Sequence, residues 1–156
     1  MSMLDTLRGQ TLAAGFAGFA ASSAAFLILA GTDFDRSFAT LAPGATIGAA
    51  ITLALFWRHA IAPSDYSLPT AFICGLITAV ISYVTMWIGA ALLSLIPGTG
   101  FRAPITGPLT RPVALISIIF YSLLLTFWVT LPLGGGAALL VTLLVARRKE
   151  RDSAAG

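Results

Sequence analysis

Four long stretches of the chain carry no charged residue. They cover residues 9–32, 37–57, 66–101 and 112–146, and are 24, 21, 36 and 35 residues long. A helix needs about 20 apolar residues to cross about 30 Å of hydrocarbon. The first two stretches therefore predict one membrane-spanning helix each, and the last two are longer than one upright span requires.

Prolines and glycines shorten the third stretch. Pro69 suits the first turn of a helix, and Pro97 followed by Gly98 stops one, which leaves a helix over 69–96. The segment 97–112 holds four of the eight prolines and three glycines, so it predicts an external surface loop rather than a helix or a central strand.

The fourth stretch contains Pro132 and three successive glycines near its middle. It is either one long helix with a kink or a tight hairpin, and the hairpin would bring the total to five spans. A hairpin leaves only 135–146 for its last crossing, which is too short to span the bilayer. The length of this stretch therefore favours one kinked helix.

The pattern thus predicts an all-α integral membrane bundle in a single domain over 1–156. Its four transmembrane helices are expected at about 10–31, 40–57, 69–96 and 114–146, with a kink near Pro132 and a basic cytoplasmic tail over 147–156. At an offset of 90 residues, 40–58 shares Thr, Leu, Gly, Thr, Leu and Arg positions with 130–148. Chance matching of small and aliphatic residues is the preferred explanation of this similarity, and a duplication that gives two tandem helical hairpins in parallel orientation is the alternative.

Composition agrees with a membrane protein. Hydrophobic residues make up 58% of the chain and charged residues 10%, whereas soluble domains carry about 25% charge. The excess of nine Lys and Arg over six Asp and Glu lies in connectors and tails, which indicates lipid headgroups rather than nucleic acid as the partner.

The distribution of Lys and Arg predicts the orientation. With four spans and both termini cytoplasmic, six basic residues lie inside and three outside; five spans with an external N-terminus give seven and two. Charge alone therefore slightly favours the topology that helix length disfavours. Both arrangements place the C-terminus in the cytoplasm, and the residues expected to anchor the chain to lipid are Trp57, Arg58, Arg147, Arg148 and Lys149.

Small residues recur at four-residue steps within the spans. Membrane helices associate through such residues because these let the backbones approach closely. The expected helix-packing residues are Gly18, Ser22, Gly44, Gly48, Thr78, Ser82, Thr126, Thr130 and Gly134. The same stripes could instead dock another copy or a larger membrane complex, and their hydroxyls could line a polar path across the bilayer.

Few residues could carry chemistry. The only histidine, His59, follows Trp57 at the end of a span, and the only cysteine, Cys74, is expected as a small packing residue, with palmitoylation as the alternative. No Asp, Glu, Lys, Arg or His lies inside a span, which argues against ion-coupled pumps and proton relays. We therefore expect no catalytic, cofactor-binding or metal-binding residues, and no enzyme activity.

The segment 130–148, with the sequence TLPLGGGAALLVTLL before a basic end, resembles uncharacterised small four-helix bacterial inner-membrane proteins. That resemblance implies a bacterial cytoplasmic membrane location and does not point to any particular activity. The expected function is a non-enzymatic accessory or scaffold subunit. The alternative is a minimal transporter or channel for an uncharged or anionic solute, which at this size would have to form a homo-oligomer.

Overall fold

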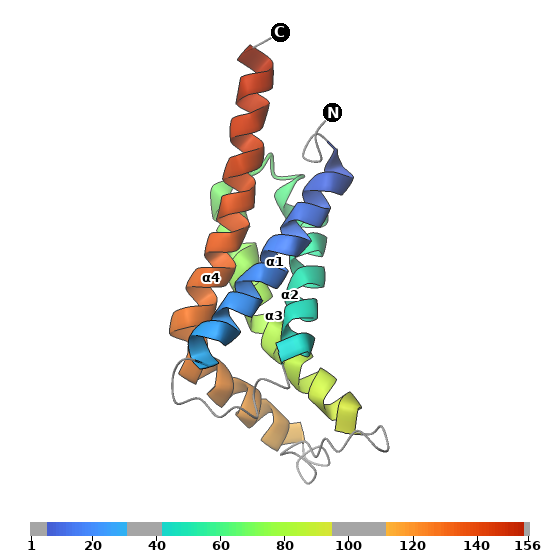
Figure 1. The fold of residues 1–156 in the computed structure, drawn as a ribbon, viewed down its shortest axis with the longest axis vertical. Coiled ribbons are helices and arrows are strands. Elements are labelled where there is room, and N and C mark those ends of the chain that lie inside the picture. The colour runs from blue at the N-terminus through green and yellow to red at the C-terminus, as the bar shows by residue number, and fades with distance from the viewer. Residues whose placement is uncertain (1–5, 31–41, 95–111, 155–156) are drawn as a thin grey trace.

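The computed structural model describes residues 6–30, 42–94 and 112–154. Over these ranges the chain is helical and contains no strand (Figure 1). Its elements are α1 (Leu7–Ala30), α2 (Ala42–Phe56), a π-helical turn η3 (Trp57–Ile61), α3 (Leu68–Ser94) and α4 (Pro112–Ala154). The predicted loop over 97–111 lies outside the described residues, and Pro112 is the first residue of α4.

All four helices are long and apolar enough to cross a membrane, with α2 and η3 together forming one span. This confirms the predicted all-α membrane bundle of four helices. The observed bounds differ by a few residues at most ends, and by eight at the end of α4, which continues to Ala154 instead of stopping at 146. The basic tail is helical there because Lys, Arg and Glu are good helix formers.

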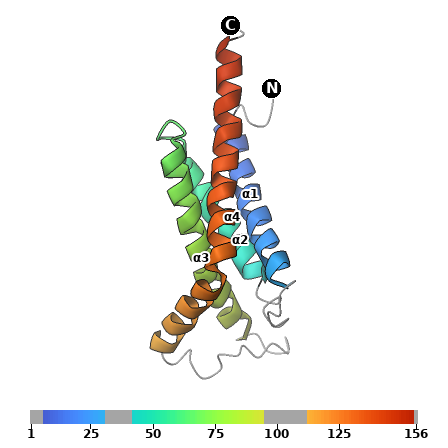
Figure 2. The same ribbon diagram turned by 90° about the vertical axis from the view of Figure 1, so that its left-hand side faces the viewer.

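The helices alternate in direction around the bundle (Figures 1 and 2). Neighbouring pairs are α1 with α2, α2 with α3, α3 with α4, and α4 with α1, while α1 and α3 lie across a diagonal. Both described chain ends and the connector between η3 and α3 therefore lie at one end of the bundle, which we call the charged end. The hairpins α1–α2 and α3–α4 run in parallel orientation.

Helix α4 is continuous through Pro132, so the chain makes four crossings and not five. Proline removes one backbone hydrogen bond and bends a helix at that point. Figure 2 shows the first half of α4 turning away from the axis of its second half, beside the diverging end of α3. The kink expected near this proline is therefore present.

The kink has a consequence for how α4 sits in lipid. The 15 residues from Pro132 to Ala146 rise about 22 Å, which leaves about 8 Å of a 30 Å hydrocarbon layer for the rest of the span. The preceding 20 residues of α4 are apolar and about 30 Å long. This first half must therefore run steeply tilted to remain in the hydrocarbon.

Close backbone approach holds neighbouring helices together. The Cα of Gly135 lies 2.8 Å from the place where a side-chain Cβ on Gly75 would be, and the Cβ of Thr85 lies 2.7 Å from the corresponding place on Gly48. At a third close approach, the carbonyl oxygen of Ala49 on α2 lies 2.7 Å from the place where a side-chain Cβ on Gly18 of α1 would be. Any side chain at these glycines would push the helices apart.

The half of the bundle near the charged end has a filled interior. Leu53, Trp57 and Ile61 reach it from α2 and η3, and Val145 of α4 and Ala14 of α1 complete it, all at most 1% exposed. Since lipid offers no hydrophobic driving force, this fit of side chains stabilises the bundle through dispersion contacts.

We expect Gly75→Ala to lower the free energy of unfolding by about 1–3 kcal/mol, because the added methyl group meets the backbone of α4. Gly136→Ala is the matched control on α4, since nothing lies within 4 Å of its Cβ position. Unfolding in lipid bicelles measures both variants. Equal stability of the two would contradict the close α3–α4 contact.

Candidate functional site

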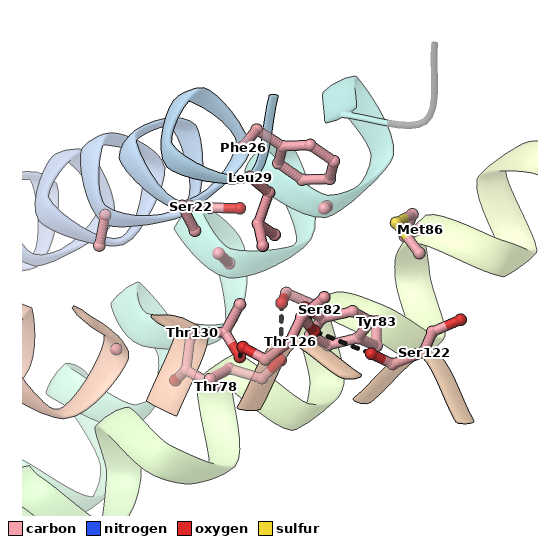
Figure 3. A pocket seen from close by; sticks show the side chains of 16 residues that line it. Ser22, Phe26, Leu29, Thr78, Ser82, Tyr83, Met86, Ser122, Thr126 and Thr130 are labelled. Carbon is pink, nitrogen blue, oxygen red and sulfur yellow. Dashed lines mark hydrogen bonds between the residues drawn. The ribbon is translucent and has the colours of Figure 1, made fainter. Parts of the chain in front are cut away.

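A cavity lies among all four helices in the half of the bundle away from the charged end (Figure 3). The space between its walls, including the open mouth, is about 610 Å³. The second half of α1, the first half of α2, the middle of α3 and residues 122–134 of α4 form its walls. Along the cavity, α3 and α4 remain in contact, since Gly134 lies against Gly75 and Ala79.

Hydroxyl groups distinguish this cavity from the filled half. Seven of its 16 lining residues carry a hydroxyl, and none of the 16 is charged. Helix α3 contributes Thr78, Ser82 and Tyr83, and α4 contributes Ser122, Thr126 and Thr130. Figure 3 shows most of these side chains on one side, with Ser22, Phe26 and Leu29 of α1 on the other.

Most of these hydroxyls use their hydrogen within the protein. Thr78 donates to the carbonyl oxygen of Cys74 at 2.8 Å, and Ser82 donates to that of Ala79 at 2.7 Å. Such bonds to the preceding turn are usual for Ser and Thr inside a helix. A hydroxyl oxygen that has donated its hydrogen still has lone pairs, so these groups face the cavity only as hydrogen-bond acceptors.

Helix α4 repeats this arrangement and links it to α3. Thr126 donates to the carbonyl oxygen of Ser122 at 2.8 Å, and Thr130 donates to that of Thr126 at 3.1 Å. Because the hydrogen of Thr126 is already engaged, its oxygen accepts the hydrogen bond from the hydroxyl of Tyr83. This bond joins α3 to α4 beside the cavity (Figure 3).

Two lining hydroxyls make no hydrogen bond to the described residues. They are Ser22 on α1 and Ser122 on α4, and Ser122 is only 6% exposed. Both can donate as well as accept. The cavity thus combines a ring of acceptor oxygens with two free donors on different walls.

A separate polar cluster lies at the charged end. The hydroxyl of Tyr66 donates to Oε1 of Gln10 at 3.0 Å, and Nζ of Lys149 lies 4.1 Å from the centre of the Tyr66 ring. These contacts tie α1, the η3–α3 connector and the end of α4 together. In the same connector, Tyr66 has a φ of 59° and Asp65 a φ of 52°, a left-handed conformation that non-glycine residues rarely adopt.

The structure places the expected packing residues at helix contacts or at the cavity. Gly44 and Gly48 lie against Met86 and Thr85 of α3, and Gly134 lies against Gly75. Gly18 contacts α2, while Ser22, Thr78, Ser82, Thr126 and Thr130 line the cavity. The four glycines of this set therefore pack against neighbouring helices, whereas its five hydroxyl-bearing residues line the cavity.

The expected lipid anchors divide into two groups. Arg58, Arg147 and Lys149 are exposed at the charged end, and Arg148 is half-buried. Trp57 differs from the expectation, because its side chain is 0% exposed in the core and contacts Tyr66 instead of the headgroup region. Its Nε1 has no hydrogen-bond partner among the described residues.

The remaining candidate residues stay apart from the cavity. Cys74 is buried in the filled half, and His59 is exposed in η3. Within the described ranges, no group of three His, Cys, Asp or Glu residues could hold a metal ion. Sequence reasoning missed Tyr83, whose position directly after Ser82 on the hydroxyl stripe was the available signal.

We expect Tyr83→Phe to lower the free energy of unfolding by about 0.6 kcal/mol, the average for an interhelical hydrogen bond in a membrane. The lost bond is the one that joins Tyr83 to Thr126. Tyr121→Phe, at an exposed position on α4, is the matched control and should leave the stability unchanged. If the two variants are equally stable in the same bicelle assay, the bond does not contribute.

Comparison with protein-family models, with curated proteins and with solved structures finds no match for the chain. The hydroxyl-lined cavity, the filled half of the bundle and the charged end are therefore the features from which a function can be argued.

Proposed function

We propose that the chain is a non-enzymatic accessory or scaffold subunit of a membrane assembly. The observation that supports this proposal is the filled half of the bundle. Leu53, Trp57 and Ile61, with their neighbours, close the interior between the cavity and the charged end. The cavity of one chain is therefore blind, as expected of a binding or structural element rather than of a pore.

The sequence supports the non-enzymatic part of the proposal. Its single histidine lies exposed in η3, and no Asp, Glu, Lys, Arg or His lies inside the four uncharged stretches to act as a general base. Assembly with other proteins would use surfaces other than the small-residue stripes. The tilted first half of α4 presents exposed large apolar side chains, among them Phe120, Tyr121 and Trp128.

The proposed location is the cytoplasmic membrane of a bacterium, with both termini in the cytoplasm. Six basic residues and three acidic ones gather at the charged end: Arg8, Arg58, Arg147, Arg148, Lys149 and Arg151, with Asp65, Glu150 and Asp152. An excess of Lys and Arg favours the cytoplasmic side, where it also attracts anionic lipids. The bacterial assignment rests on the resemblance of the last helical segment.

The alternative is a minimal transporter for an uncharged solute, working as a homo-oligomer. One observation favours it: the seven hydroxyls around the cavity are a polar group in the middle of an apolar bundle. Transport through a single chain would need the filled half to open, which requires Trp57 and Leu53 to leave the core.

Purification in a mild detergent tests the proposal. We expect the chain to co-purify with a larger membrane protein, and vesicles containing the chain alone to stay impermeable to glycerol and to chloride. A photoreactive residue in place of Tyr121 should cross-link to that protein, and one in place of Phe16 on α1 serves as the matched exposed position. A monomer without partners, together with glycerol flux through its vesicles, would favour the transporter instead.

Reporters test the orientation. A reporter joined after Gly156 should be active on the cytoplasmic side. A reporter inserted in the 97–111 segment should be active on the opposite side, because this segment joins the end of α3 to the start of α4. A cytoplasmic signal from both positions would contradict four crossings, and an exchange of the two signals would contradict the proposed orientation.

A further inference from the structure

The hydroxyl group of Ser122 is available to bind a ligand in the cavity. This side chain is 94% buried, lines the cavity and makes no hydrogen bond to the described residues. A hydroxyl that lines the cavity without such a partner can both donate a hydrogen bond to a bound group and accept one from it. Ser22, on the wall formed by α1, offers a second free hydroxyl.

The other lining groups set the chemistry of such a partner. Thr78, Ser82, Thr126 and Thr130 have donated their hydrogens to helix carbonyls, so their oxygens accept but do not donate. A ligand group that donates one hydrogen bond and accepts another can bond both to these acceptor oxygens and to the hydroxyls of Ser22 and Ser122. A hydroxyl group does both.

The lack of charge in the cavity wall limits the kinds of ligand that can bind. None of the 16 lining residues is charged, so a carboxylate, a phosphate or an ammonium group in the cavity would have no counter-ion. Placing an isolated charge in such surroundings is strongly unfavourable. The polar group of the ligand must therefore be neutral.

The rest of the wall is apolar and belongs to a bundle that lies in lipid. Phe26, Leu29 and Met86 line the cavity together with several alanines, and they suit a hydrocarbon chain. The cavity lies in the half of the bundle away from the charged end, and its mouth is partly open.

We propose that this cavity binds an uncharged, hydroxyl-headed amphiphile taken from the membrane, with its hydroxyl between Ser22, Ser122 and the acceptor oxygens of α3 and α4. The hydrocarbon chain of the ligand lies against Phe26, Leu29 and Met86. This binding is independent of whether the chain serves as a scaffold subunit or as a transporter.

Photolabelling tests the proposal with the full chain in phosphatidylcholine nanodiscs. The probe is decanol carrying a diazirine group, and mass spectrometry locates the labelled residues. We expect saturable labelling of cavity residues, reduced by unlabelled decanol but not by decane or decanoate. The alkane lacks the hydroxyl and the carboxylate is charged, so together they separate hydroxyl recognition from simple partition into lipid.

Two variants and one control examine the residues. Ser122→Ala should weaken saturable labelling about fivefold, which corresponds to the loss of one ordinary hydrogen bond. Ser23→Ala, next to Ser22 on α1 but outside the cavity lining, should leave it unchanged. Ala21→Leu adds bulk to the wall and should abolish the labelling while the variant keeps its unfolding stability.

Three results would overturn the proposal. Labelling that does not saturate and spreads over lipid-exposed side chains such as Phe16 and Leu27 would show partition only. Equal competition by decane and decanol would show that the hydroxyl group of the ligand is not recognised. Equal labelling of the Ser122→Ala and Ser23→Ala variants would remove Ser122 from the site.

Discussion

The structure depends on close backbone contact between helices at a few glycines. In lipid, helices gain little from burying apolar side chains against one another, because the surrounding hydrocarbon is equally apolar. Their association therefore relies on dispersion contacts, which require the backbones to come near. Gly75 and Gly134 make this possible between α3 and α4, and Gly18 and Gly48 do so at the two contacts of α2.

This packing gives the bundle two different halves. Near the charged end the helices stay close together, and Leu53, Trp57 and Val145 fill the space between them. In the other half α4 bends near Pro132, its first turns point away from the end of α3, and a cavity lies among the four helices. The Tyr83–Thr126 hydrogen bond links α3 to α4 beside this cavity.

The sequence predicted much of this fold because lipid imposes simple constraints on it. The four stretches without charge predicted the four helices. The segment after Pro132 is too short to cross the membrane by itself, and this favoured one kinked helix. The small-residue stripes marked residues that do lie between helices. Trp57 was expected at the lipid surface, and its full burial was not predictable, because an aromatic residue at the end of a span suits either the headgroups or the core.

The continuity of α4 through Pro132 decided between four crossings and five. By itself, the sequence determined that the chain lies in a membrane and that no Asp, Glu, Lys, Arg or His lies inside its four uncharged stretches. Both properties follow from the composition and from the thickness of the hydrocarbon layer, and neither depends on which helices pack against each other. Only the tertiary structure decided that hydroxyls from α1, α3 and α4 surround one cavity and that Ser22 and Ser122 remain without a partner there. Those properties depend on which helix faces meet, and helical periodicity alone leaves that choice open.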